Sequence, residues 1–171
     1  MVKTYFITAS AYMHENIFQR DENAELLLKT LLRYRDAGEV QLHEFVIMPN
    51  HIHLLLSVDE DHTVGRTMQM VKGGFSHALH ENGPKRTAVW QPSYYEHRVR
   101  NMEEYGRMRC YIHNNPVHRG LAKMASAYPY PSAARADNRN EVPARLKPQN
   151  NFGIFDAGLK ARTTRANNVL S

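Results

Sequence analysis

The chain has 171 residues and a formal net charge of +5, and 42% of its residues are hydrophobic. This composition excludes a chain too polar to fold, and the length suffices for one domain with a substantial core. Residues 1–131 carry 15 basic against 14 acidic side chains, whereas residues 132–171 carry 7 against 3. Most of the excess positive charge therefore lies near the C-terminus, and an acidic partner is compatible with it.

Cysteine usage and hydropathy favour a cytoplasmic protein. Cys110 is the only cysteine, which precludes a disulfide within the chain. No apolar run approaches the ~20 residues that a membrane-crossing helix needs. Residues 1–5 also lack the apolar core of a signal peptide. We expect no contact with a membrane.

The first elements in chain order are a strand and a helix. Residues 4–9 are rich in β-forming side chains and predict a strand. Residues 23–37 carry leucines at helical spacing, with Asn23 as a candidate N-cap and Gly38 as a stop signal.

Two further strands follow so closely that they predict a hairpin. Residues 40–48 and 51–58 form these strands, and Pro49 and Asn50 form the turn between them. We expect three apolar side chains of the first strand to alternate onto one face: Leu42, Val46 and Met48.

A helix, a strand and a last helix complete the predicted domain. The helix covers residues 63–81 and is weakened by two adjacent glycines, and the strand lies near residues 94–99. The last helix covers residues 102–114, and Pro116 predicts its end near Asn115. This order predicts an α+β fold, a ferredoxin-like βαββαβ sandwich with an additional C-terminal helix.

Apolar periodicity is lost after residue 131. We expect residues 1–131 to form one domain and residues 132–171 to form a basic, flexible tail with at most a short docking segment.

His51 and His53 are the first candidate for chemistry. Side chains alternate along a strand, so both imidazoles point to one face while Ile52 and Leu54 point to the other. Two imidazoles about 7 Å apart on a rigid strand can converge on one cation. Histidines that only line a polar face are the alternative, and a metal site needs a third ligand.

Tyr111 and Asn115 are the second candidate. They are four residues apart on the predicted last helix and therefore share one face, from which His113 points away. An amide oxygen is a hard ligand suited to Mg or Mn, and a phenol can act as a covalent nucleophile. Packing of the tyrosine and helix termination by the asparagine are the alternatives. The carboxylate of Glu44 or Asp59 could accept a hydrogen bond from the imidazole nitrogen that does not face the metal.

The stretch from 90 to 100 mixes aromatic residues with Arg and His, as do surfaces that stack bases and pair with phosphates. The pattern is also that of an ordinary strand, whose two faces the sequence does not assign to core or solvent. The candidate DNA contacts are Trp90, Tyr94, His97, Arg98, Arg100 and Arg119.

Three anchors of this chain resemble one family. They are MPNHIHLLL at residues 48–56, the Trp-Gln pair at 90–91, and YIHNNPVHRGL at 111–121. In order and spacing they are similar to the single-tyrosine HUH transposases of small bacterial insertion sequences, in particular the REP-associated tyrosine transposases. The resemblance covers residues 1–131.

The resemblance implies a role for each motif. His51 and His53 would bind Mg or Mn, Asn115 would complete the metal site, and Tyr111 would be the nucleophile. Other branches have Gln at the position of Asn115, so this helix would sit closer to the metal. The family cuts single-stranded DNA at or near imperfect hairpins through a 5′-phosphotyrosine link, as a monomer or a homodimer.

Two other functions stay open from the sequence. A hairpin-binding or single-strand-binding protein could use the same fold without chemistry. A zinc hydrolase could use the histidines with a carboxylate, although neither an HExxH motif nor a cysteine pair is present.

Overall fold

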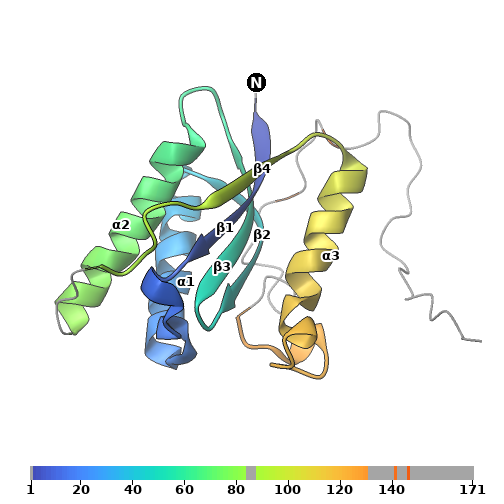
Figure 1. The fold of residues 1–171 in the computed structure, drawn as a ribbon. Helices are drawn as coiled ribbons and strands as arrows, with labels where there is room; N and C mark the ends of the chain where they lie inside the picture. Colours follow the sequence, from blue (N-terminus) through green and yellow to red (C-terminus); the bar gives the residue numbers. More distant parts are fainter. Residues whose placement is uncertain (1, 84–87, 131–140, 142–145, 147–171) are drawn as a thin grey trace, which may run out of the picture.

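The computed structural model describes residues 2–83, 88–130, 141 and 146. A four-stranded antiparallel sheet lies between two helices on one face and a third helix on the other (Figure 1). The elements follow the order predicted from the sequence, and the ferredoxin-like α+β sandwich with an additional helix is confirmed. The part of the chain that is described contains no helix long and apolar enough to cross a membrane.

The strands pair in the order β2-β3-β1-β4, which places β1 and β3 in the centre. Every pairing is antiparallel. The bounds of the strands are Lys3–Ser10 for β1, Gln41–Met48 for β2, His51–Val58 for β3 and Tyr95–Val99 for β4. Short 3-10 turns in the described part of the chain include Tyr12–His14, Ile17–Gln19 and Ala125–Ala127.

Helices α1 (Asp21–Asp36) and α2 (Val64–Asn82) bury the larger apolar core against one face of the sheet. The Thr63 hydroxyl caps α2 by accepting a hydrogen bond from the Arg66 N–H at 3.1 Å. From β3, this core takes the side chains at alternate positions, as predicted: Ile52, Leu54, Leu56 and Val58.

Helix α3 (Met102–His118) covers the opposite face, mainly over β2 and β3. Its apolar side chains, among them Ile112, form a smaller cluster with the other alternate strand positions, which include Phe6 and Leu55. This is the face to which His51 and His53 belong, because they alternate with the positions that face α1 and α2.

The predicted alternation along β2 is wrong at its start. Val46 and Met48 face α3, whereas Leu42 faces α1 and α2. The register shifts between Leu42 and Glu44, where a bulge inserts one extra residue and reverses the faces. The hydrophobic pattern along one β-strand contains no sign of such an insertion.

Two predicted helix ends also differ. Helix α1 begins at Asp21 without a side-chain cap, and the Asn23 amide instead donates to the Ile17 carbonyl at 2.8 Å. Helix α3 continues through Pro116 to His118. A proline in the last turn removes only its own N–H bond, and its carbonyl still accepts from Leu121 N–H at 2.8 Å.

The predicted tail lies outside the described residues except for Glu141 and Leu146, so its flexibility stays a prediction. Leu146 is buried in the apolar cluster under α3. Tyr128 and Tyr130 lie beside β2, where the Tyr128 hydroxyl donates to the Ile47 carbonyl and the Tyr130 carbonyl accepts from Ile47 N–H.

Candidate active site

His51 and His53 converge at the start of β3, as their spacing predicted. Their Nε2 atoms are 3.1 Å apart, and the ring centroids are 4.7 Å apart. His53 is buried, and His51 is half-buried at the end of the sheet. The two imidazoles therefore present their Nε2 atoms to a single point.

The neighbours of each imidazole orient these nitrogens. The Asn50 Oδ1 atom, 2.6 Å from His51 Nδ1, can only accept, so Nδ1 carries the proton and Nε2 carries a lone pair. His53 Nδ1 lies 2.8 Å from the hydroxyl of Thr8, its cross-strand partner on β1. A hydrogen bond at Nδ1 that fixes the orientation of the ring is the usual arrangement for a metal-binding histidine.

Asn115 approaches the pair from α3 and is 3% exposed. Its Nδ2 atom lies 3.2 Å from His53 Nε2, whereas its Oδ1 atom has no hydrogen-bond partner among the described residues. A half-turn of the amide exchanges these two atoms and brings the oxygen toward the two nitrogens. Asn115 is therefore positioned to supply a third ligand atom.

Neutral imidazoles cannot satisfy all of these contacts at once. If His53 Nε2 accepts a hydrogen bond from Asn115 Nδ2, its lone pair and that of His51 Nε2 belong to atoms only 3.1 Å apart. If His53 Nε2 instead donates to His51 Nε2, it cannot accept from Asn115. A cation facing both lone pairs and a turned Asn115 amide removes the conflict. The residues present thus fit a divalent cation with two nitrogen ligands and one oxygen ligand.

The protonation state also suits a metal site. Burial lowers the pKa of His51 to about 4 and that of His53 to about 3, with a further contribution from the positive charge of Arg119. Both imidazoles are therefore neutral at neutral pH, which is the form that binds a metal.

Tyr111 lies beside this group on the solvent side. Its ring packs edge-on against His53 and Phe6, with centroids 5.2 and 5.8 Å apart, and its side chain is 44% exposed. Tyr111 and Asn115 share a face of α3, as the four-residue spacing predicted. A phenol open to solvent thus lies next to the candidate metal ligands, within one chain.

Glu44 supports the other flank of α3 and not the histidine pair. Its carboxylate is buried, with Oε2 2.8 Å from His113 Nε2 and Oε1 3.1 Å from Arg109 Nε. His113 therefore points away from Tyr111, as predicted. Neither Glu44 nor Asp59 contacts His51 or His53, so the expected support of the imidazoles is not found. The Asp59 carboxylate instead accepts a hydrogen bond from His62.

The described residues contain no group of three or more His, Cys, Asp or Glu side chains that could hold a metal. The zinc hydrolase reading requires a carboxylate beside the histidine pair. The candidate third ligand here is an amide, which weakens that reading.

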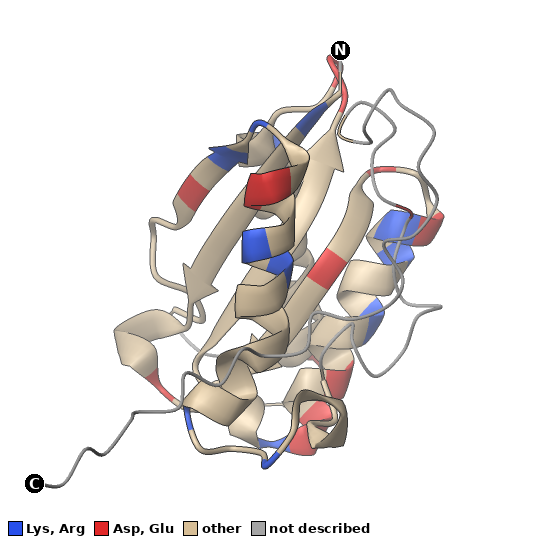
Figure 2. Ribbon diagram, turned by 90° about the vertical axis from the view of Figure 1, so that its right-hand side faces the viewer, with Lys and Arg blue, Asp and Glu red and all other residues tan. Residues whose placement is uncertain are grey.

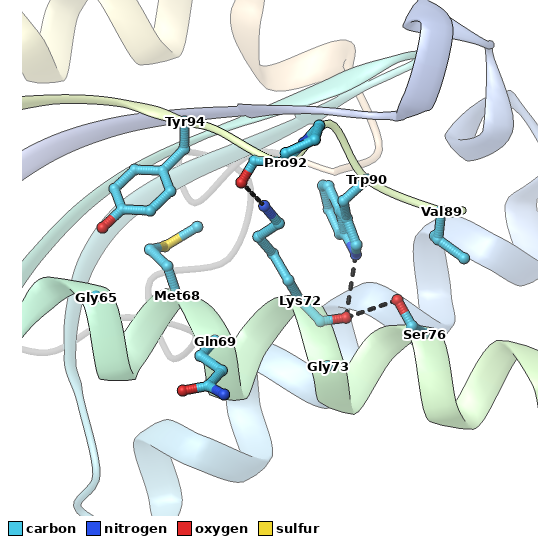
Figure 3. Close-up of a pocket in the computed structure, with 10 residues that line it drawn as sticks. All are labelled: Gly65, Met68, Gln69, Lys72, Gly73, Ser76, Val89, Trp90, Pro92 and Tyr94. Carbon is cyan, nitrogen blue, oxygen red and sulfur yellow. Dashed lines mark hydrogen bonds between the residues drawn. The ribbon is translucent and has the colours of Figure 1, made fainter. Parts of the chain in front are cut away.

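Trp90 and Tyr94 line a different site from the histidine pair. A pocket of about 480 Å³ lies between α2 and the segment that leads into β4 (Figure 3). Trp90 is 7% exposed, packs against Phe18 and donates from Nε1 to the Lys72 carbonyl at 3.1 Å. Its ring is part of the core, so a base cannot stack on it without opening these contacts.

The pairing of β1 with β4 assigns the faces that the sequence left open. His97 pairs with Phe6, which faces α3, so Tyr95 and His97 lie on the α3 face and Arg98 lies on the other. His97 contacts the Glu104 carboxylate at the start of α3 at 3.7 Å. That same carboxylate accepts from the Arg100 N–H at 2.8 Å.

Arg119 follows the last turn of α3 and is exposed, close enough to both imidazoles to affect their pKa. Thr8 is a site residue that the sequence did not reveal, and Tyr95 lies on the same face of the sheet. The positions of both residues depend on the register of β1 with β3 and β4, which the pattern along one β-strand does not contain.

Fold and site together define a ferredoxin-like protein in which a histidine pair, an asparagine and a tyrosine meet under a third helix. The family model described as "Transposase IS200 like" matches residues 3–115. The chain belongs to this family and is a transposase-like DNA-processing enzyme.

Relatives of known sequence and structure agree with this family. The chain is 28% identical over 120 residues to the REP-associated tyrosine transposase of Escherichia coli K12, covering 70% of each chain. It is 28% identical over 144 residues to an uncharacterized protein of Haemophilus influenzae, covering 66% of this chain and 79% of that one. The resemblance to REP-associated tyrosine transposases is thus confirmed.

A solved structure shares the fold. A REP-associated tyrosine transposase bound to a REP hairpin superposes with a TM-score of 0.66 at 22% identity, covering 99% of this chain and 93% of that chain.

Proposed function

We propose that the protein is a metal-dependent single-stranded DNA endonuclease and strand transferase that uses Tyr111 as its nucleophile. The observation that carries the proposal is the exposed Tyr111 ring against His53, 5.2 Å between centroids, with Asn115 one turn further along the same helix. Nucleophile and candidate metal ligands lie in one chain, so a monomer contains a complete site.

His51, His53 and Asn115 would hold Mg or Mn, which would polarise a phosphoryl oxygen and favour the phenolate form of Tyr111. Tyr111 Oη forms a bond to phosphorus and loses its proton to solvent. The bond from phosphorus to the 3′ oxygen breaks, and that oxygen takes up a proton. The products are a 5′-phosphotyrosine and a free 3′-OH.

The reverse step joins strands without an external energy source. One phosphodiester bond replaces another, so attack by a 3′-OH on the phosphotyrosine regenerates the DNA backbone and the phenol. The side chains that hold the 5′-phosphate in place during cutting serve equally in rejoining.

The proposed substrate is single-stranded DNA with imperfect hairpins. The solved structure of similar fold holds a REP hairpin, and the net charge of +5 favours a polyanion. Arg119 beside the histidine pair and Arg100 directly after β4 are the proposed phosphate contacts, whereas Arg98 on the opposite face could contact only DNA that passes around the β4 edge.

A denaturing gel with labelled hairpin DNA tests the chemistry directly. Wild type with Mn or Mg should give a protein–DNA adduct that is absent with EDTA and absent in Tyr111→Phe, while Tyr111→Phe still binds DNA. An adduct formed by Tyr111→Phe would remove Tyr111 from its role. Tight binding without any adduct would favour a non-catalytic hairpin-binding protein.

A further inference from the structure

Tyr95 exposes a large aromatic ring on the same face of the sheet as the candidate active site. It begins β4, and its side chain is 59% exposed. Isolated exposed aromatics are common on protein surfaces and need no explanation. The position of Tyr95 relative to the histidine pair is what sets it apart.

The strand register connects Tyr95 directly to the site. Thr8 on β1 pairs with His53 on one side and with Tyr95 on the other. Its hydroxyl lies 2.8 Å from His53 Nδ1. Since neighbouring strands lie about 4.8 Å apart, the backbone of Tyr95 is about 10 Å from that of His53. A stacked strand advances about 3.4 Å per nucleotide, so this distance corresponds to about three nucleotides.

Phe6 joins the two places. Its ring lies 5.5 Å from His53, 5.8 Å from Tyr111 and 6.4 Å from Tyr95, centroid to centroid. Phe6 itself is 6% exposed, so it supports the two tyrosines and offers little surface of its own. Tyr111 and Tyr95 are thus two exposed rings held on either side of one buried ring.

Among the described residues, helix α3 lies mainly over the other side of the sheet, away from β4. In Figure 2, α3 runs in front of the sheet, and β4 forms the edge beside it. The main strand contacts of α3 are with β2 and β3, on the side away from β4. A strand of DNA leaving Tyr111 toward β4 would therefore reach the Tyr95 ring first.

We propose that Tyr95 stacks an unpaired nucleobase of the substrate strand, within about three nucleotides of the phosphate that Tyr111 attacks. This inference rests on the proposed function and adds a binding site to it. Every base has a π-face, so stacking on Tyr95 would fix the path of the strand without reading its sequence.

A double-mutant cycle between Tyr95 and single abasic positions tests this contact. The DNA is a hairpin with single-stranded flanks, in which one unpaired nucleotide at a time is made abasic. Affinity is measured by fluorescence anisotropy in EDTA, so that no strand is cut. Tyr95→Phe keeps the ring, whereas Tyr95→Ala removes it.

Tyr95→Ala should weaken binding of the intact strand roughly tenfold, and Tyr95→Phe should stay within about twofold of wild type. One abasic position should weaken wild type similarly and cause no further loss in Tyr95→Ala. Tyr94→Ala is the control, because the Tyr94 side chain lines the pocket against α2; its effect should add to that of every abasic position. Thermal melting of each variant checks that it is folded.

Additive losses at every abasic position, or no loss in Tyr95→Ala, would overturn the stacking proposal and leave the Tyr111 chemistry untouched. If Tyr95 and one abasic position are coupled but wild type forms no protein–DNA adduct, the stacking proposal stands and the proposed Tyr111 chemistry is overturned. A wild-type protein that binds none of these strands would overturn both.

Discussion

Replacing Asn115 with leucine should make the metal-free protein more stable and strongly reduce its stabilisation by Mn. Asn115 is 3% exposed, and its Oδ1 atom has no partner among the described residues. A buried polar atom without a partner costs roughly 1–3 kcal/mol, and an apolar side chain of similar shape relieves that cost. The substitution also removes the hydrogen bond from Nδ2 to His53, worth about 0.5–1.5 kcal/mol.

The balance of these two effects is a gain of about 1 kcal/mol in EDTA, which raises the melting temperature by about 2–4 °C for a chain of this size. Wild type in Mn at about 100 times its dissociation constant should gain about 2.7 kcal/mol. The leucine variant should gain far less, because it lacks the oxygen ligand. Urea unfolding with and without Mn measures both effects.

Asn114→Leu is the matched control for this experiment. Asn114 is the preceding residue on α3, is exposed, and donates to the Cys110 carbonyl. Its replacement should change stability by no more than about 0.5 kcal/mol and keep the full response to Mn. An Asn115→Leu variant that is less stable than wild type in EDTA, yet responds fully to Mn, would refute the assignment of Asn115 as a ligand.

Two further substitutions test the support of the site and the packing of the helices. Thr8→Val removes the hydroxyl beside His53 Nδ1 and should weaken Mn binding about 10–100-fold by calorimetry with little change in fold; unchanged affinity would deny Thr8 an orienting role. On α2, Gly73→Ala should stabilise the protein by about 0.5–1 kcal/mol, since its Cβ meets no described atom within 4 Å. Gly74→Ala would place its Cβ 2.6 Å from Tyr34 Oη and should be at least about 1 kcal/mol less stable than Gly73→Ala in urea; equal stabilities would contradict this packing argument.

Local periodicity predicted the parts of the site that lie on one element. Alternation along a strand placed His51 and His53 on one face, and the four-residue repeat of a helix placed Tyr111 and Asn115 on one face. Such rules state which residues share a face and not which element covers that face. That α3 packs over the histidines depends on the whole arrangement of the chain.

Features that depend on pairing between elements could not be predicted from patterns along one element. The bulge between Leu42 and Glu44 and the alignment of Tyr95 with Thr8 are properties of two strands together. The passage of α3 through Pro116 depends on the last turn, where the lost hydrogen bond matters least.

Strand β2 contributes to the candidate site indirectly, through its contacts with α3. The Glu44 carboxylate reaches His113 and Arg109 on α3, two residues either side of Tyr111. Glu44 faces α3 because the pairing of β2 with β3 is unbroken from Glu44 to the hairpin turn, whereas the bulge before Glu44 reverses the faces of Gln41 and Leu42. The two contacts with the Glu44 carboxylate and the apolar packing of Ile112 hold this turn of α3 on the sheet. The position of Tyr111 over His53 therefore depends on the register of a strand that contributes no residue to the site itself.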